Sequence, residues 1–318
     1  MADNHLIAKN TVFLYIRMLL SMGIYLYTTR VVLSILGVED YGIYNVVGGL
    51  VAMFSFLNAT MSGATSRFIT FELGKNSSKV QTVFSVALTI HIIIALIVFL
   101  IGETFGLWFL ENKLTIPATK MYEAKWLLQF SIVTMIFSFT QVPYNASIIA
   151  HEKMNIYAYF ELVNVGLKLL SVYLLLIIDA NKLIFYGAIV MLTQIGVTLL
   201  YRLYCTRKWE HCKFNLSLDR EFLRPLLSYS GWDLFGNASL VARTQGVNVL
   251  LNIFFGAILN AAAGIAMQVQ TAAMSFATNV MTAFRPQIVK TYAAKSYSEM
   301  INLISLGSII TYILYLII

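Results

Sequence analysis

The stretch FLYIRMLLSMGIYLYTTRVV, residues 13 to 32, is long and apolar enough to cross a bilayer, yet it carries Arg17 and Arg30. A transmembrane helix needs about 20 predominantly apolar residues and satisfies its own backbone hydrogen bonds. Arginine keeps its charge in proteins, so each of these side chains must reach the interface or face protein or water. The stretch therefore predicts a membrane helix with a polar face.

The composition extends this interpretation to the whole chain of 318 residues. Hydrophobic residues make up 59% of the sequence and charged residues 12%, whereas soluble domains are near half apolar and about one quarter charged. We attribute the net charge of +7 to basic cytoplasmic loops and not to a surface for nucleic acid. The composition therefore predicts an all-α polytopic membrane protein.

Apolar runs divide the chain into about nine membrane helices, of which the last is cut by the end of the sequence at TYILYLII. Basic residues concentrate in alternate loops, and the positive-inside rule then predicts a cytoplasmic N terminus. The cut run leads us to expect a truncated chain. The expected spans are 10–36, 41–70, 81–102, 124–149, 156–178, 183–204, 228–252, 257–284 and 300 to the end.

A polar stretch, CTRKWEHCKFNLSLDREFLRP (205–225), separates two halves that resemble each other weakly at an offset of 220 residues. We expect an N-lobe with six helices over 1–204, a cytoplasmic linker over 205–227 and a partial C-lobe with three helices over 228–318. Six helices per repeat is an even number, so both repeats enter the membrane from the same side. The expected fold is a two-lobe helical bundle transporter with parallel six-helix repeats and an incomplete second lobe.

Isolated polar residues inside the spans are the candidate functional residues, because each is costly in lipid. In the first span, Arg17 and Ser21 share a helical face with Asn10 and Thr28. We expect Arg17 to face a cavity, with snorkelling to the headgroups as the alternative. For Arg30 we give equal weight to facing a cavity and to snorkelling to the headgroups.

The fifth and seventh spans carry further polar stripes. Lys168 lies near mid-span, too deep for easy snorkelling, so we expect it to face protein, water or a partner charge. A charge clamp between helices is the alternative for the fifth span. The substrate candidates on these two spans are Asn164, Lys168, Asn237, Arg243, Thr244 and Asn248, and the candidates for ion or proton coupling are Glu161, Asp233 and His91.

Motifs for catalysis, nucleotide binding or metal binding are lacking, so we expect neither an enzyme nor a bound cofactor. Cys205 and Cys212, beside the single His211, do not have zinc-ligand spacing and are expected to stay reduced. For His91, a hydrogen bond to a neighbour is the favoured interpretation over a coupling role. The polar spans therefore point to transport.

The motif LGVEDYGIYN (36–45), together with the first two spans and AFRPQIVK (283–290), resembles the bacterial polysaccharide-unit flippases of the Wzx type. These form the polysaccharide transporter branch of the multidrug/oligosaccharidyl-lipid/polysaccharide exporter superfamily. The resemblance implies two six-helix lobes around a cavity in the bacterial inner membrane. It also implies alternating access that moves undecaprenyl-pyrophosphate-linked oligosaccharide, of the O-antigen or capsule type, to the periplasmic leaflet.

The family also implies basic residues in the cavity, a role that fits Arg17 best and Arg243 second. Its expected partners are the lipid-linked oligosaccharide, membrane lipids, and a polysaccharide polymerase with chain-length proteins. One alternative is a cation-coupled exporter of drugs or metabolites from the same superfamily, which we expect to have an acidic cavity. The other is an integral-membrane glycosyltransferase or polymerase, which we expect to carry a large periplasmic loop that this sequence lacks.

Overall fold

The computed structural model confirms an all-α protein, with no strand in the part of the chain that it describes. The main helices are α1 (Asn4–Ala52), α2 (Ser55–Gly74), α3 (Val80–Ile101), α4 (Leu107–Asn112), α5 (Met121–Ala150), α6 (Met154–Ile177), α7 (Lys182–Lys208), α8 (Arg220–Ala293) and α9 (Tyr297–Ile317). A π-helix (Gly102–Gly106) joins α3 to α4, and short 3-10 helices cover Ala118–Lys120 and Glu210–Cys212. The structure describes residues 4–52, 54–75, 77–114, 116–177 and 181–317. At 4–6, 38, 52, 56, 59, 241–269, 271–272 and 317 it describes the backbone alone.

Helix α1 contains two membrane segments because its backbone breaks at Gly37, where φ is 77° and ψ is 171°. This conformation lies in the positive-φ region that glycine adopts without steric cost. The chain turns back there, so that residues 38–52 lead toward α2. The first two predicted spans therefore correspond to the first part of α1 and to its last part together with α2.

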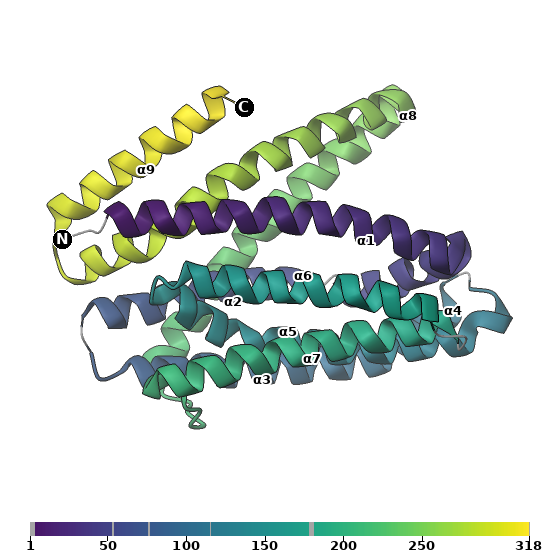
Figure 1. Ribbon diagram of the computed structural model, residues 1–318, viewed down its shortest axis with the longest axis horizontal. Coiled ribbons are helices and arrows are strands. Elements are labelled where there is room, and N and C mark those ends of the chain that lie inside the picture. Colours follow the sequence, from purple (N-terminus) through teal and green to yellow (C-terminus); the bar gives the residue numbers. More distant parts are fainter. Residues whose placement is uncertain (1–3, 53, 76, 115, 178–180, 318) are drawn as a thin grey trace.

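Helices α1 to α7 pack into one bundle around two main clusters of buried side chains, with α5 in contact with α2, α3 and α7. Phe84 of α3 and Tyr144 of α5 meet edge to face in one cluster. Phe139 of α5 is fully buried in the other cluster. Helix α6 lies against α1 and α7, and closes the bundle on the side opposite α3 (Figure 1).

Helix α8 runs for 74 residues, which would be about 110 Å if it were straight. A bilayer core is about 30 Å thick, and Figure 1 shows α8 running outward and then turning back toward α9. The two predicted spans 228–252 and 257–284 both lie within it. Near the N terminus of the chain α8 contacts α1 and α2, whereas its far tip lies well away from α1 (Figure 1).

Six helical segments of the described chain are long and apolar enough to cross a membrane. They are Ile7–Gly37, Val80–Asn112, Ala118–Ala150, Met154–Ile177, Lys182–Lys208 and Tyr297–Leu316. The remaining predicted spans coincide with helices that contain more polar residues, namely α2 and the two arms of α8. These lengths and compositions support a multi-pass membrane protein.

Candidate functional site

The contact between α8 and the earlier helices, called the seam below, is held at one end by Glu152. This residue lies in the turn between α5 and α6, is 7% exposed and has a φ of 59°. Its carboxylate accepts hydrogen bonds from Gln287 Nε2 at 2.8 Å and from Lys290 Nζ at 2.5 Å, both on α8. Its carbonyl accepts a bond from Asn10 Nδ2 at 3.1 Å. One turn thus connects α1 and α8.

The backbones of α2 and α8 approach each other closely at Gly74, at the same end of the seam. A Cβ atom at this position would lie 2.8 Å from Lys290 Cα and 2.9 Å from Ala293 Cβ. Nearby, the rings of Phe71 and Tyr292 pack against each other at 6.2 Å. Glycine is therefore required here by the approach of two helices.

Arg17 lies farther along the seam and faces the protein. Its Nη1 donates to Tyr157 Oη of α6 at 3.0 Å, and its Nη2 donates to Asn279 Oδ1 of α8 at 3.3 Å. The structure shows no carboxylate within ion-pair distance of Arg17 among the residues it describes. A half-buried guanidinium with only neutral partners keeps its positive potential, so this point of the seam favours an anionic group.

Beyond Arg17, a cavity of about 400 Å³ opens between α1, α6 and α7. We call it the tyrosine pocket, because four tyrosines line it beside Ser21, Asn45, Glu161 and Lys168. Glu161 is half-buried and Lys168 is exposed, and both lie on α6. The tyrosines are Tyr25, Tyr41, Tyr44 and Tyr186. The pocket therefore combines aromatic walls with one acid and one base.

Several buried polar atoms around this pocket and Arg17 have no hydrogen-bond partner among the described residues. Buried polar atoms in proteins are normally bonded to protein or to water. Such atoms also occur elsewhere in the described chain, and the five on α1, α6 and α7 would be satisfied by water or a polar ligand between these helices. The atoms are Arg17 Nε, Ser21 Oγ, Thr28 Oγ1, Asn164 Oδ1 and Tyr201 Oη.

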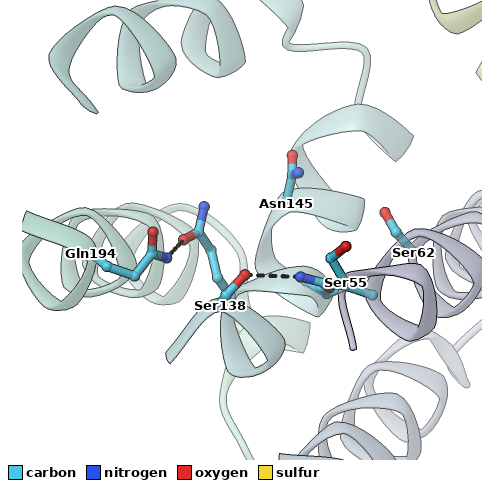
Figure 2. Close-up of a pocket in the computed structure, with 8 residues that line it drawn as sticks. Ser55, Ser62, Ser138, Asn145 and Gln194 are labelled. Carbon is cyan, nitrogen blue, oxygen red and sulfur yellow. Dashed lines mark hydrogen bonds between the residues drawn. The ribbon is translucent and has the colours of Figure 1, made fainter. Parts of the chain in front are cut away.

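A second polar cavity of about 350 Å³, here called the amide chamber, lies between α2, α5 and α7 (Figure 2). Asn58 Nδ2 donates to Ser138 Oγ at 2.8 Å, and Gln194 Nε2 donates to Gln141 Oε1 at 2.8 Å. Figure 2 shows Asn145, Ser55 and Ser62 around the same space. All side chains that line it are uncharged. A third cavity shares Ser55, Ser138 and Gln194 with this chamber, and Tyr44 and Val190 with the tyrosine pocket.

The structure brings some of the sequence-predicted residues together and separates others. Ser21, Glu161 and Lys168 line the tyrosine pocket. Asn237 of α8 instead donates to Thr60 of α2 at 3.3 Å and to Asp233 at 3.4 Å. The polar face of the seventh span therefore meets α2 at this point.

His91 lies apart from both cavities. It is fully buried in α3, and its Nδ1 is bonded to the carbonyl of Ala87 in its own helix at 2.7 Å. This is the local hydrogen bond that we favoured for it. The side chains of Arg243, Thr244 and Asn248 lie outside the described residues.

Sequence reasoning missed the aromatic wall of the tyrosine pocket and most of the amide chamber. Tyrosines are common near membrane interfaces, so their positions in the sequence did not mark a pocket. Gln141 and Gln194 are polar residues in the middle of apolar helices, and this feature could have identified them. Tyr157 and Asn279 could not be assigned to Arg17, from which they are 140 and 262 residues distant.

Comparison with known proteins gives structural matches only. No family model matches the sequence, and no curated protein matches it. An outward-facing multidrug resistance MATE family transporter of the MOP superfamily superposes with a TM-score of 0.82 at 14% identity, over 98% of this chain and 70% of that one. A MATE in complex with MaD3S gives a TM-score of 0.81 at 15% identity, over 97% and 71%.

A MOP superfamily transporter from Pyrococcus furiosus superposes with a TM-score of 0.79 at 14% identity, again over 98% of this chain and 70% of that chain. At these identities the matches establish the fold. They show the fold alone, and they do not test the polysaccharide branch that the sequence resembles. This protein is an all-helical chain with the fold of the MATE transporters of the MOP superfamily.

Proposed function

We propose that this protein is an exporter that moves a small amphipathic organic molecule across the membrane by alternating access. The fold is that of transporters, one of which is named for multidrug resistance. The proposal rests chiefly on the tyrosine pocket. Ligand sites for drug-sized molecules are typically 300–1,000 Å³ in volume, with aromatic walls and few polar groups, and the pocket of about 400 Å³ has this character.

Glu161 and Lys168 place one negative and one positive group in the lining of the tyrosine pocket. A carboxylate beside tyrosine rings suits an organic cation, because ring faces attract positive charge. The same carboxylate is the best placed group for coupling to a proton or a sodium ion, since it lies on α6 facing the pocket. A cargo and a coupling ion that compete for Glu161 would exchange there, which is a simple means of coupled export.

The arrangement of the seam supports alternating access. The described contacts of α8 with earlier helices include the end near Glu152 and the level of Arg17 and Asn237. Bundles that are held at one end and separate at the other can rock about a site between them. The MATE family transporter that superposes with a TM-score of 0.82 was solved in an outward-facing conformation.

A second candidate function, translocation of a lipid-linked oligosaccharide diphosphate, is favoured by one observation. Arg17 offers a planar set of donors without a carboxylate partner, and such a group suits phosphate oxygens. The volume of the tyrosine pocket argues against this second function, because the pocket can hold a drug-sized molecule but not several linked sugars.

A single deletion strain separates the two functions. For the first, we expect the strain to become more sensitive to amphipathic organic cations and its membranes to show normal lipid-linked sugars. Accumulation of lipid-linked repeat units at the inner leaflet would instead favour the second function. If neither sensitivity nor lipid-linked intermediates change, and purified protein in liposomes moves no fluorescent organic cation, the export proposal is wrong.

A further inference from the structure

A groove of about 650 Å³ lies on the seam between α2 and α8, outside the tyrosine pocket and the amide chamber. We call it the seam groove. Its walls are aromatic, with Phe68 and Phe71 from α2 and Tyr229, Trp232 and Tyr292 from α8. Arg67 of α2 and Asp233 of α8 are its charged residues. The groove therefore combines a large apolar surface with a few polar groups.

The positive charge of Arg67 is not compensated within the groove. Its guanidinium lies 4.7 Å from the centroid of the Tyr229 ring, and no carboxylate lies within ion-pair distance of it among the described residues. Asp233 Oδ2 accepts a hydrogen bond from Asn237 Nδ2 at 3.4 Å. Asp233 Oδ2 and the guanidinium of Arg285 both lie within 4 Å of the point where Gly63 would carry a Cβ atom.

We expect the groove to lie at the level where lipid headgroups meet the acyl region. Arg67 precedes the end of α2 at Gly74 by seven residues, which corresponds to about 10 Å along the helix. Trp232 is 76% exposed, and tryptophan is enriched at this level of a bilayer. The neighbouring loop carries the basic residues Lys75 and Lys79, but these pair with Glu72 and Glu221. The attraction for an anion in the groove therefore comes from Arg67.

We propose that the seam groove binds the headgroup and upper acyl chain of an anionic phospholipid, with Arg67 on the phosphate and the aromatic residues along the chain. An organic cation fits less well, because Arg67 already occupies the face of the Tyr229 ring. The groove has walls from both α2 and α8. A bound lipid therefore bridges the two and strengthens the contact between them.

Quenching of Trp232 fluorescence by brominated lipids tests this directly. The full chain with Trp108, Trp126 and Trp209 replaced by Phe is reconstituted in mixed vesicles, so that Trp232 alone reports. We expect brominated phosphatidylglycerol to quench Trp232 at lower mole fraction than brominated phosphatidylcholine. Arg67→Gln should weaken the preference about fivefold, since one basic residue near an anionic surface is worth about 1 kcal/mol. Arg67→Lys should retain most of it.

The matched control is Arg202→Gln, because Arg202 is an exposed arginine on α7 away from the groove. This variant should keep the full preference. Equal quenching by the two lipids, or a preference that survives Arg67→Gln, would overturn the proposal. Loss of the preference in millimolar inorganic phosphate would assign the site to free phosphate and also overturn it. If the Phe variants do not fold, native mass spectrometry of the unmodified chain gives the same comparison through the number of retained lipids.

Discussion

The carboxylate of Glu152 binds the ammonium group of Lys290 at 2.5 Å, and this pair joins the turn between α5 and α6 to the last turns of α8. The acid is 8% exposed and the base 31% exposed. Breaking a partly buried pair leaves one group without a partner, which is costly in a way that an exposed pair is not. The pair is therefore the strongest single connection at the closed end of the seam.

We expect Glu152→Gln to weaken the seam by about 1–3 kcal/mol, because the amide cannot replace a charged acceptor for both Gln287 and Lys290. The unfolding midpoint of the protein in detergent should fall. Lys79→Gln is the matched control, since Lys79 pairs with Glu221 at 2.6 Å while both side chains are at least half exposed. A control variant that loses as much stability as Glu152→Gln would show that burial of the pair does not matter.

Gly74→Ala should separate α2 from α8. The added methyl group would lie 2.8 Å from Lys290 Cα, and overpacking of this kind costs about 1–3 kcal/mol. Gly63→Ala is the control in the same helix, because its nearest described atoms are side-chain ends at 3.8 Å or more. The thiol reactivity of a cysteine introduced at the end of the seam near Glu152 should rise in Gly74→Ala and stay unchanged in Gly63→Ala. Equal accessibility in both variants would contradict the close approach.

Arg17→Ala should lower export while membrane insertion stays normal. Two hydrogen bonds that join α1 to α6 and α8 are lost, each contributing about 1.5–3 kcal/mol to stability. We therefore expect the seam to loosen at the level of Arg17 and export to fall. Arg30→Ala is the control, since Arg30 is exposed on the same helix. Export would be measured as efflux from reconstituted liposomes. Unchanged efflux in Arg17→Ala would place Arg17 among the structural residues.

His151 should make the protein less stable as the pH falls. Burial against Trp209 and His211 lowers the pKa of His151 to about 4, whereas an unfolded histidine has a pKa of about 6.5. Between these values the unfolded state binds more protons, so stability is full above about pH 6.5 and is lost as the pH falls toward 4. His151→Phe keeps a ring in the stack and should flatten the dependence. A wild-type unfolding midpoint that is the same at pH 7.5 and pH 5 would contradict it.

The helices were largely predictable because a bilayer fixes the length of an apolar run. The fifth span was expected at 156–178 and α6 covers Met154–Ile177. The linker was expected to reach residue 227, but α8 begins at Arg220, where Asp219 caps the helix by accepting a bond from Glu221 N at 2.9 Å. The charged residues there hid the start of the helix, because hydropathy outweighed the capping signal. The division into two lobes stays a prediction.

The candidate site was predictable only one helix at a time. The polar face of the first span led us to expect Arg17 in a cavity, whereas its guanidinium is bonded to Tyr157 and Asn279. The stripe on the fifth span indicated Glu161 and Lys168, which line the tyrosine pocket. Periodicity does not show which helices meet, so the contact of Asn237 with Thr60 could not be foreseen. The tyrosine pocket requires side chains from three helices at once, and only tertiary packing brings them together.

The most direct test of alternating access is a pair of distances measured in the same reconstituted protein by double electron–electron resonance. Spin labels at Lys75 and Lys295 report the end of the seam near Glu152, and labels at Leu33 and Met274 report a level farther from Glu152; all four side chains are exposed. When cargo or the pH gradient is changed, we expect the distance between Lys75 and Lys295 to lengthen while the distance between Leu33 and Met274 shortens. If the two distances change in the same direction, or neither responds under any condition that drives export, the bundles do not rock about the seam.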